Sequence, residues 1–210
     1  MVPAIDFATR IERAEDALVL GPGQVAGLTG IPGAGLTRLG LSMLVPHVTR
    51  GPIAVVDVRG WISPLAAWEM GIDPDRLVIV RAKDIVRWGR VTATLLDGVG
   101  AVYAEVPTGI KDAAIRRLIA RARTRKTPMV LRPLSGDLPS GAVHVRVAVR
   151  SVAWTGTDAG HGRLNVRRIV LDASGRSTRG MGQLIEVEDD GTNDLRVVPH
   201  VGAHETRHLA

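Results

Sequence analysis

The stretch Gly30-Ile31-Pro32-Gly33-Ala34-Gly35-Leu36-Thr37 predicts the fold of this chain. It follows the phosphate-binding loop pattern G-x-x-x-x-G-K-[ST] at its glycines and its threonine, but Leu36 replaces the lysine. Such a loop grips phosphate with backbone N–H groups at a helix N-terminus, and the lysine adds a positive charge on the β- and γ-phosphates. Leucine keeps the shape and removes that charge. The stretch therefore predicts a nucleotide-binding fold that has lost hydrolysis.

Four residues of this stretch form the candidate nucleotide site. They are Gly30, Gly33, Gly35 and Thr37. One interpretation is a residual cradle for a nucleotide or another anion; the other is a vestigial loop that only turns the chain from a strand into a helix. The vestigial interpretation is favoured, because the missing lysine removes a point charge that the phosphates would use. We therefore predict no catalytic residue, no cofactor and no metal.

Short apolar runs alternate with helical segments along the first two thirds of the chain. Runs rich in β-branched residues are typical of buried parallel strands. They cover residues 25–29, 53–58, 77–80, 101–104 and 129–131. Helical segments are predicted near 36–49, 64–71, 84–97 and 110–124. This alternation predicts an α/β fold, with a mostly parallel sheet flanked by helices on both faces.

The pattern changes beyond the fifth apolar run. Residues 143–150 alternate between apolar and polar side chains, which predicts a half-exposed strand. Residues 164–171 predict its partner, joined to it through a glycine-rich turn at 155–163. Two more short strands are predicted at 183–187 and 195–198. The α/β core is thus expected to carry antiparallel C-terminal strands.

Three parts are predicted along the chain. They are an N-terminal helix over 1–20, the core over 21–175, and an acidic C-terminal segment over 176–210 that is partly ordered at most. Residues 181–210 carry six acidic and two basic residues, a net charge of −4. The N-terminal helix has an apolar stripe that includes Phe7 and Ile11, and such a stripe must be buried against something. We predict that this stripe binds a partner protein or a second copy of the chain.

Composition restricts where the protein works. No apolar run among the 210 residues reaches the roughly 18 that a membrane span needs, and the N-terminus has no signal pattern. Cysteine is absent, which excludes disulfides and thiolate metal sites. A net charge of +6 suits work beside nucleic acid or an acidic partner, while an aromatic content of 3% argues against base-stacking platforms. A cytoplasmic protein with no membrane attachment is expected.

Five arginines gather on the last predicted helix of the core. They are Arg116, Arg117, Arg121, Arg123 and Arg125. They cover the face opposite the apolar stripe of that helix, so the simplest interpretation is a solvated face. The alternative is a patch that makes a weak contact with the DNA backbone or binds an acidic partner. Both interpretations stay open at the level of sequence.

Trp61 and Trp68 are two of the few large aromatic residues. They are seven residues apart, so they can share one face of a helix. Core packing is the simplest role for most of the four tryptophans, Trp61, Trp68, Trp88 and Trp154, and a protein-binding hot spot is the alternative if one of them is exposed.

The order of segments from about residue 15 to 175 resembles the core domain of RecA-type recombinases. In that family the glycine loop precedes a strand that ends in Asp-Ala-Glu, then a helix and a Gly-Val-Asp-x-Asp-Asn-Leu turn. Residues 56–59 and 70–78 stand here in the same order and at similar spacing. The family's strand that ends in the Mg²⁺-associated aspartate resembles residues 101–105. The resemblance implies a RecA-like P-loop core.

Three departures from the family pattern imply a pseudo-ATPase. Leu36 removes the phosphate lysine, and Arg59 stands where the family has the glutamate that activates water. Glu105 replaces the aspartate associated with Mg²⁺. Arginine cannot act as the general base, so the combined losses imply that hydrolysis is gone.

Short, catalytically stripped RecA-like chains of this kind are similar to the ImuA group, including its actinobacterial form. This resemblance implies an accessory protein in DNA-damage-induced translesion synthesis and mutagenesis, within the SOS response. The implied partners are a polymerase-like adaptor of the ImuB type and, through it, an error-prone replicative-type polymerase. Two alternatives stay open: a RecA-like DNA-dependent ATPase or recombinase paralogue, and a SulA-like cell division inhibitor.

Overall fold

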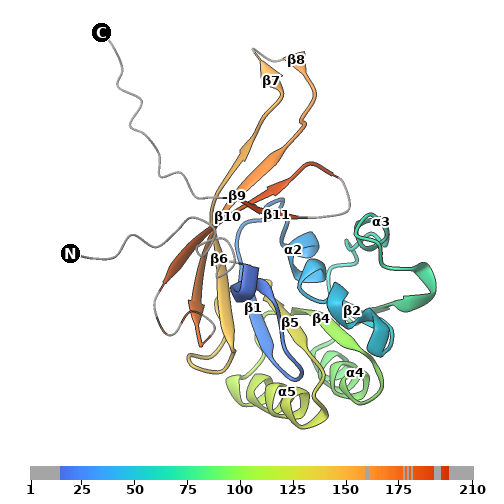
Figure 1. Ribbon diagram of the computed structural model, residues 1–210. Helices are drawn as coiled ribbons and strands as arrows, with labels where there is room; N and C mark the ends of the chain where they lie inside the picture. Colours follow the sequence, from blue (N-terminus) through green and yellow to red (C-terminus); the bar gives the residue numbers. More distant parts are fainter. Residues whose placement is uncertain are drawn as a thin grey trace.

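The computed structural model describes residues 15–158, 161–176, 178, 180, 182–191 and 195–198. One twisted sheet forms its centre, with helices packed against it and a narrow hairpin that projects from one end (Figure 1). Residues 15–18 are helical and form the described end of the predicted N-terminal helix. Phe7 and Ile11 lie outside the described residues.

Nine strands form the main sheet, in the order β11-β10-β9-β6-β1-β5-β4-β2-β3. They are β1 (Val25–Thr29), β2 (Ile53–Asp57), β3 (Leu77–Arg81), β4 (Ala101–Val106), β5 (Met129–Pro133), β6 (Val145–Trp154), β9 (Arg167–Gly175), β10 (Gln183–Asp189) and β11 (Arg196–Val198). Neighbouring strands from β6 to β3 run parallel. The pairs β6–β9, β9–β10 and β10–β11 are antiparallel. The predicted α/β fold, with a largely parallel sheet and antiparallel C-terminal strands, is confirmed.

Four α-helices and two 3₁₀ turns connect the strands. They are α2 (Leu36–Ser42), η1 (Val45–Arg50), α3 (Leu65–Trp68), η2 (Pro74–Arg76), α4 (Ile85–Gly98) and α5 (Asp112–Arg125). The first two helices are shorter than predicted. After α2 the chain tightens into η1, because Pro46 cannot donate the backbone hydrogen bond that a continuing helix requires. The chain leaves α3 through Gly71, whose φ of 76° suits glycine and ends a helix.

The apolar core has two parts, one on each face of the sheet. Side chains alternate along a strand, so Ile53 and Val55 of β2 pack with α2 and α3, whereas Ala54 and Val56 pack with α4 and α5. Trp88 of α4 is fully buried in the second part. Both faces of β2 are therefore covered, which explains why its sequence is a continuous apolar run rather than an alternating one.

The antiparallel half of the sheet extends farther than predicted. The ribbon of β6 and β9 continues into a small hairpin of β7 (Thr157–Asp158) and β8 (His161–Gly162), which occupies the predicted glycine-rich turn and projects beyond the body (Figure 1). β10 and β11 add to the same sheet, whereas the predicted domain boundary at residue 175 stays a prediction. Within the described parts of the chain, no helix is long and apolar enough to cross a membrane.

Candidate functional site

The glycine loop, residues 30–37, joins the end of β1 to the start of α2. Gly33 and Gly35 have φ values of 82° and 80°, a left-handed conformation that favours glycine. The Ala34 N–H donates to the Ile31 carbonyl oxygen at 3.3 Å, so the loop makes a tight turn before the helix begins. It lies at the carboxyl edge of the parallel strands, where ligands usually bind in sheets of this kind. The predicted site residues are adjacent in this loop.

The side chain of Leu36, at the lysine position, points into the core. Only 2% of Leu36 is exposed, and it belongs to the apolar cluster under α2. A Cβ built on Gly30 would lie 3.4 Å from Leu36 Cδ1, which places the side chain against the start of the loop. This residue therefore stabilises the loop by packing and adds nothing to the binding of an anion.

Arg167 of β9 lies against the glycine loop. Its Nη1 donates to the Gly33 carbonyl oxygen at 3.3 Å, and a Cβ built on Gly35 would lie 2.6 Å from its Nη2. The guanidinium forms an ion pair with the buried Asp189 at the end of β10. It also stacks over Trp154, 5.3 Å from the ring centroid. The guanidinium of Arg167 thus occupies the space beside Gly35.

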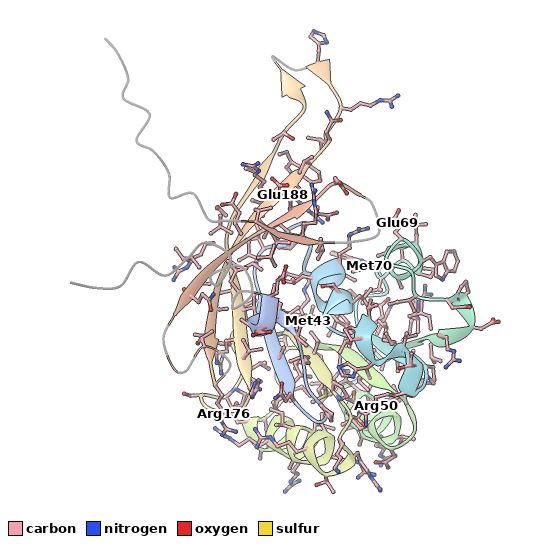
Figure 2. All side chains as sticks on the ribbon, in the orientation of Figure 1. Met43, Arg50, Glu69, Met70, Arg176 and Glu188 are labelled. Atoms are coloured by element: carbon pink, nitrogen blue, oxygen red, sulfur yellow. The ribbon has the colours of Figure 1, made fainter. Side chains whose placement is uncertain are left out.

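Arg38 of α2 joins the same cluster. Its Nη1 donates to Glu69 Oε2 at 2.7 Å, and its Nε lies 3.4 Å from Asp189 Oδ2. Figure 2 shows Glu69 just after the end of α3, and its carboxylate binds Arg38 of α2. Asp189 therefore holds two arginines from different elements. We call Arg38, Arg167, Asp189 and Glu69 the loop cluster.

Glu105 of β4 lies deeper, at the centre of a second network. Its carboxylate is completely buried and accepts hydrogen bonds from the backbone N–H groups of Val58, at 3.0 Å, and Arg59, at 3.2 Å. Arg59 also donates through Nε at 2.9 Å and forms an ion pair with Glu105 through Nη2. The Arg132 Nη1 atom lies 3.9 Å from Glu105 Oε1. These bonds give Glu105 a structural role, because they connect β4 to the residues that follow β2.

Asp57 shapes the turn that positions Arg59. The Asp57 carboxylate is buried and accepts from the N–H groups of Gly60 at 2.7 Å, Trp61 at 3.3 Å and Ile62 at 3.2 Å. These bonds satisfy backbone donors that would otherwise be unpaired in the turn. Arg59 then lies over the Trp61 ring, 4.7 Å from the centroid.

A third group, Arg132, Thr37 and Tyr103, lies between the loop and the sheet. Arg132 Nη1 donates to Thr37 Oγ1 at 3.4 Å, a long bond. The Tyr103 hydroxyl is buried without a hydrogen bond, and burial raises the pKa of Tyr103 despite the nearby Arg132 cation. A Cβ on Gly40 would lie 2.4 Å from the Tyr103 ring, so a glycine is required there for the ring to fit.

Sequence reasoning missed Asp189, Arg132 and Arg167 as parts of this site. Arg132 directly follows the three buried apolar residues of the predicted strand 129–131, and a charge in that place was a detectable sign of a specific partner. Asp189 and Arg167 gave no comparable sign, because they come from antiparallel strands whose register the sequence does not fix.

The predicted arginine patch lies on α5, on the opposite face of the sheet from α2. Four of its five arginines bind groups of the same chain. Arg121 and Arg125 share Asp97, Arg123 donates to the Ala142 carbonyl oxygen at 2.8 Å, and Arg116 to that of Ser140 at 3.2 Å. Arg117 has no ion pair within the described part of the chain. The contact with DNA stays a prediction, and it would have to compete with these bonds.

Replacing Asp97 by asparagine should make the free energy of unfolding less dependent on pH in the acid range. A hydrogen bond from Arg121, with the charge of Arg125 adding to it, holds the pKa of Asp97 below its usual value. Such a group stabilises the fold above the unfolded-state pKa of about 3.9, and this contribution is lost as pH falls through the lower folded-state pKa. Asp97→Asn should therefore lose less stability than the natural chain below about pH 4, measured as urea midpoints.

The control for Asp97 is Asp75→Asn in the short η2 turn, an exposed acid without an ion pair among the described residues. Its urea midpoints should follow those of the natural chain at every pH. Identical acid profiles for Asp97→Asn and the natural chain would show that Arg121 and Arg125 do not depend on Asp97, which would free them for an external partner.

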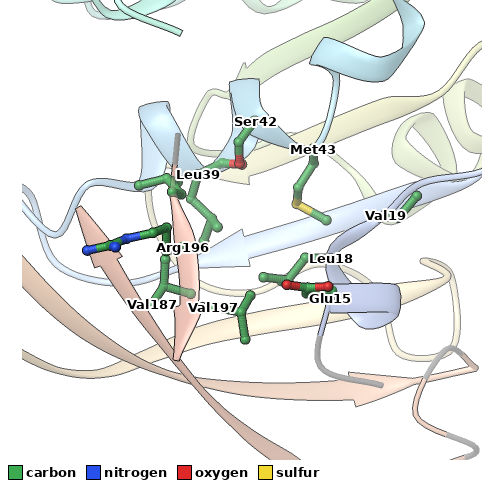
Figure 3. Close-up of a pocket in the computed structure, with 10 residues that line it drawn as sticks. Glu15, Leu18, Val19, Leu39, Ser42, Met43, Val187, Arg196 and Val197 are labelled. Carbon is green, nitrogen blue, oxygen red and sulfur yellow. The ribbon is translucent and has the colours of Figure 1, made fainter. Parts of the chain in front are cut away.

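Trp61 and Trp68 are not core residues: 71% of Trp61 and 45% of Trp68 are exposed. Core packing, expected for most of the four tryptophans, is therefore confirmed for the fully buried Trp88 and is wrong for Trp61, Trp68 and the 43% exposed Trp154. The hot-spot interpretation stays a prediction. A separate pocket lies where the described end of the N-terminal helix meets α2 and the β10–β11 pair (Figure 3). Leu18, Met43 and Val197 are among its lining residues, so apolar side chains face it from three segments.

Within the described residues there is no group of three or more histidines or carboxylates that could hold a metal ion. In a comparison with protein families, the model of the MT3502 N-terminal domain matches residues 17–139, more than half of the chain. The matched part includes the glycine loop, Arg59 and Glu105, whereas Arg167 and Asp189 lie beyond it. No curated protein matches the chain.

Proposed function

The chain belongs to the MT3502 N-terminal domain family, and from this premise we propose an accessory protein with a degenerate RecA-like core that does not hydrolyse ATP. One observation carries the proposal. Arg167 lies against the two left-handed glycines of the loop and is neutralised by Asp189, a carboxylate of the same chain. The contacts that a nucleotide phosphate would make with these groups are therefore made internally.

Two further features support the loss of hydrolysis. Leu36 packs in the core, so no cation extends from that position toward the mouth of the loop. By the resemblance to RecA-type recombinases, Arg59 occupies the position of their water-activating carboxylate, and it is bound to Glu105. A metal ion at Glu105 would have to displace both the guanidinium and two backbone N–H groups.

We place this accessory protein in DNA-damage-induced translesion synthesis. The support is the resemblance of its segment order and its departures to the ImuA group. In this role the sheet is a rigid scaffold that binds a polymerase-like adaptor of the ImuB type and, through it, an error-prone replicative-type polymerase. The exposed Trp61 and Trp68 suit a scaffold, because exposed indoles are common anchors of protein interfaces.

Purified protein is expected to show no ATP turnover above the buffer rate, with or without single-stranded DNA. Leu36→Lys should not restore turnover, because position 36 faces the core and Arg59 still blocks the base position. The same variant should be less stable by about 2–4 kcal/mol, the scale of burying an unpaired polar or charged group. Leu36→Met, of similar volume, is the control and should cost less than about 1.5 kcal/mol.

The alternatives are separated by the same preparation. Turnover in the natural chain at the level of an active RecA-type enzyme would favour the DNA-dependent ATPase. Failure to bind an ImuB-type adaptor on gel filtration, together with binding to a tubulin-like division GTPase, would favour the SulA-like inhibitor. A stable complex with the adaptor and no turnover would support the proposed function.

A further inference from the structure

We infer that the open edge of the sheet at β3, with the first turn of α4, binds an extended acidic segment of a partner protein. The inference rests on the proposed function only in that an accessory protein needs a surface for its partner. We call this surface the β3 strip. It consists of residues from β3, from the connection 82–84 and from the first turn of α4. They are Val78, Arg81, Lys83, Ile85, Val86 and Arg87.

The edge of β3 can accept another strand. β3 is the last strand of the sheet on this side, and no described strand pairs with its outer edge. The Ala82 N–H donates inward to the Asp57 carbonyl oxygen at 3.1 Å. Because successive residues of a strand direct their N–H and C=O groups to opposite edges, those of Ile79 and Arg81 face outward. An added segment would satisfy these groups.

The cations of the β3 strip lack carboxylate partners within the described residues. Arg81, Lys83 and Arg87 are exposed, and none of them forms a salt bridge there. Asp84, which lies between Lys83 and Ile85 in the chain, accepts from the Arg87 backbone N–H at 2.8 Å and so caps α4. Asp57, the register partner of Arg81 on β2, accepts from the backbone N–H groups of residues 60–62. On α5, by contrast, Arg121 and Arg125 already share the carboxylate of Asp97. Charge complementarity therefore favours a partner that brings carboxylates.

The apolar residues of the strip decide between a peptide and a nucleic acid. Val78, Ile85 and Val86 are 39%, 43% and 62% exposed. A phosphate backbone would make no favourable contact with three aliphatic side chains. A second copy of β3 would place the cations of the two strips beside each other, which is unfavourable. In an added strand, side chains alternate between the two faces. Aliphatic residues can then lie beside Val78 on the α4 side, with acidic residues beside Arg81 on the other face.

The test uses the full chain and a phage-displayed library of random 12-residue peptides. Selected peptides should alternate Asp or Glu with Val, Ile or Leu, and should avoid proline at the centre. Synthetic copies should bind more weakly to the Arg81→Glu, Lys83→Glu double variant by about tenfold or more, measured by fluorescence anisotropy. The Arg50→Glu, Lys111→Glu variant is the matched control, since these two exposed cations, at the end of η1 and just before α5, lack ion pairs in the described chain, and it should bind normally.

A second pair of variants tests strand addition itself. Arg81→Pro removes the outward N–H and the charge, whereas Arg81→Gln removes only the charge. The proline variant should bind the peptides more weakly than the glutamine variant, with both equally folded by circular dichroism. Equal affinities would overturn strand addition.

Other outcomes overturn the whole inference. Basic selected peptides, or acidic ones that bind the double variant normally, would show that the β3 strip is not the site. A 20-nucleotide poly-dT strand that bound this surface, when no peptide did, would assign the strip to nucleic acid. ATP turnover would defeat the proposed function and leave these peptide results standing, so the two failures are distinguishable.

Discussion

Replacing Arg59 by leucine is expected to lower the free energy of unfolding by about 3–5 kcal/mol, the cost of leaving a buried charge without its partner. Glu105 is completely buried, and after the change it would keep only the two backbone N–H groups and the more distant Arg132. The loss should be visible as a lower urea midpoint with an unchanged slope.

Two further variants make this prediction specific. Glu105→Gln removes the buried charge and keeps one oxygen to accept from the two backbone N–H groups, whereas its NH2 group cannot accept from Arg59. It should cost less than Arg59→Leu, because no buried charge is left without a partner. Arg59→Glu restores the carboxylate found in active RecA-type enzymes, but it places that group beside Glu105, and it should be the least stable of the three. If all three variants were within about 1 kcal/mol of the natural chain, the network would be no stronger than a surface pair.

The parallel half of the fold could be predicted because burial on both faces leaves a clear sequence pattern. Residues 53–58 and 101–104 are continuous apolar runs, and both became central strands of the sheet. Where propensity alone had to place an end, the prediction was less accurate. The helix predicted over 36–49 stops at Ser42, because Pro46 lies beyond it and the chain tightens into a 3₁₀ turn.

The candidate site could be predicted only in part. The glycine loop was found because left-handed turns require glycine, and glycine is visible in the sequence. That Leu36 faces the core could not be known, since a motif gives the identity of a residue and not the direction of its side chain. The partners Arg167 and Asp189 arrive through β9 and β10, more than a hundred residues later, and their pairing depends on strand register.

The partners of the five arginines on α5 could not be predicted from the sequence either. Five arginines on one helix face are compatible with a solvated surface, a DNA contact or internal pairing, and the sequence alone does not distinguish these roles. Asp97, which binds two of the five, lies at the end of the neighbouring helix. Packing of α4 against α5 therefore determines what the arginines do, and helical periodicity contains no information about that packing.

The second large effect is expected for Asp189→Asn. This change removes the carboxylate that Arg38 and Arg167 share and leaves Glu69 as the remaining acid of the loop cluster. The variant should be less stable by about 3–5 kcal/mol in dilute buffer. The matched control is Asp172→Asn, whose partner Arg150 is 64% exposed, and it should change stability by less than about 1 kcal/mol.

The response of Asp189→Asn to anions decides whether the glycine loop is a vestige or a cradle. If the loop still binds phosphate, Asp189 acts as an internal substitute for it, and ATP or pyrophosphate should recover much of the lost stability. At a hundred times the dissociation constant, a ligand that binds only the folded state returns about 2.7 kcal/mol. If neither compound raises the melting temperature of the variant, while the natural chain is equally unaffected, residues 30–37 serve only to turn the chain from β1 into α2. The second outcome is expected, because Leu36 supplies no charge and Arg167 needs Asp189 to remain beside Gly35.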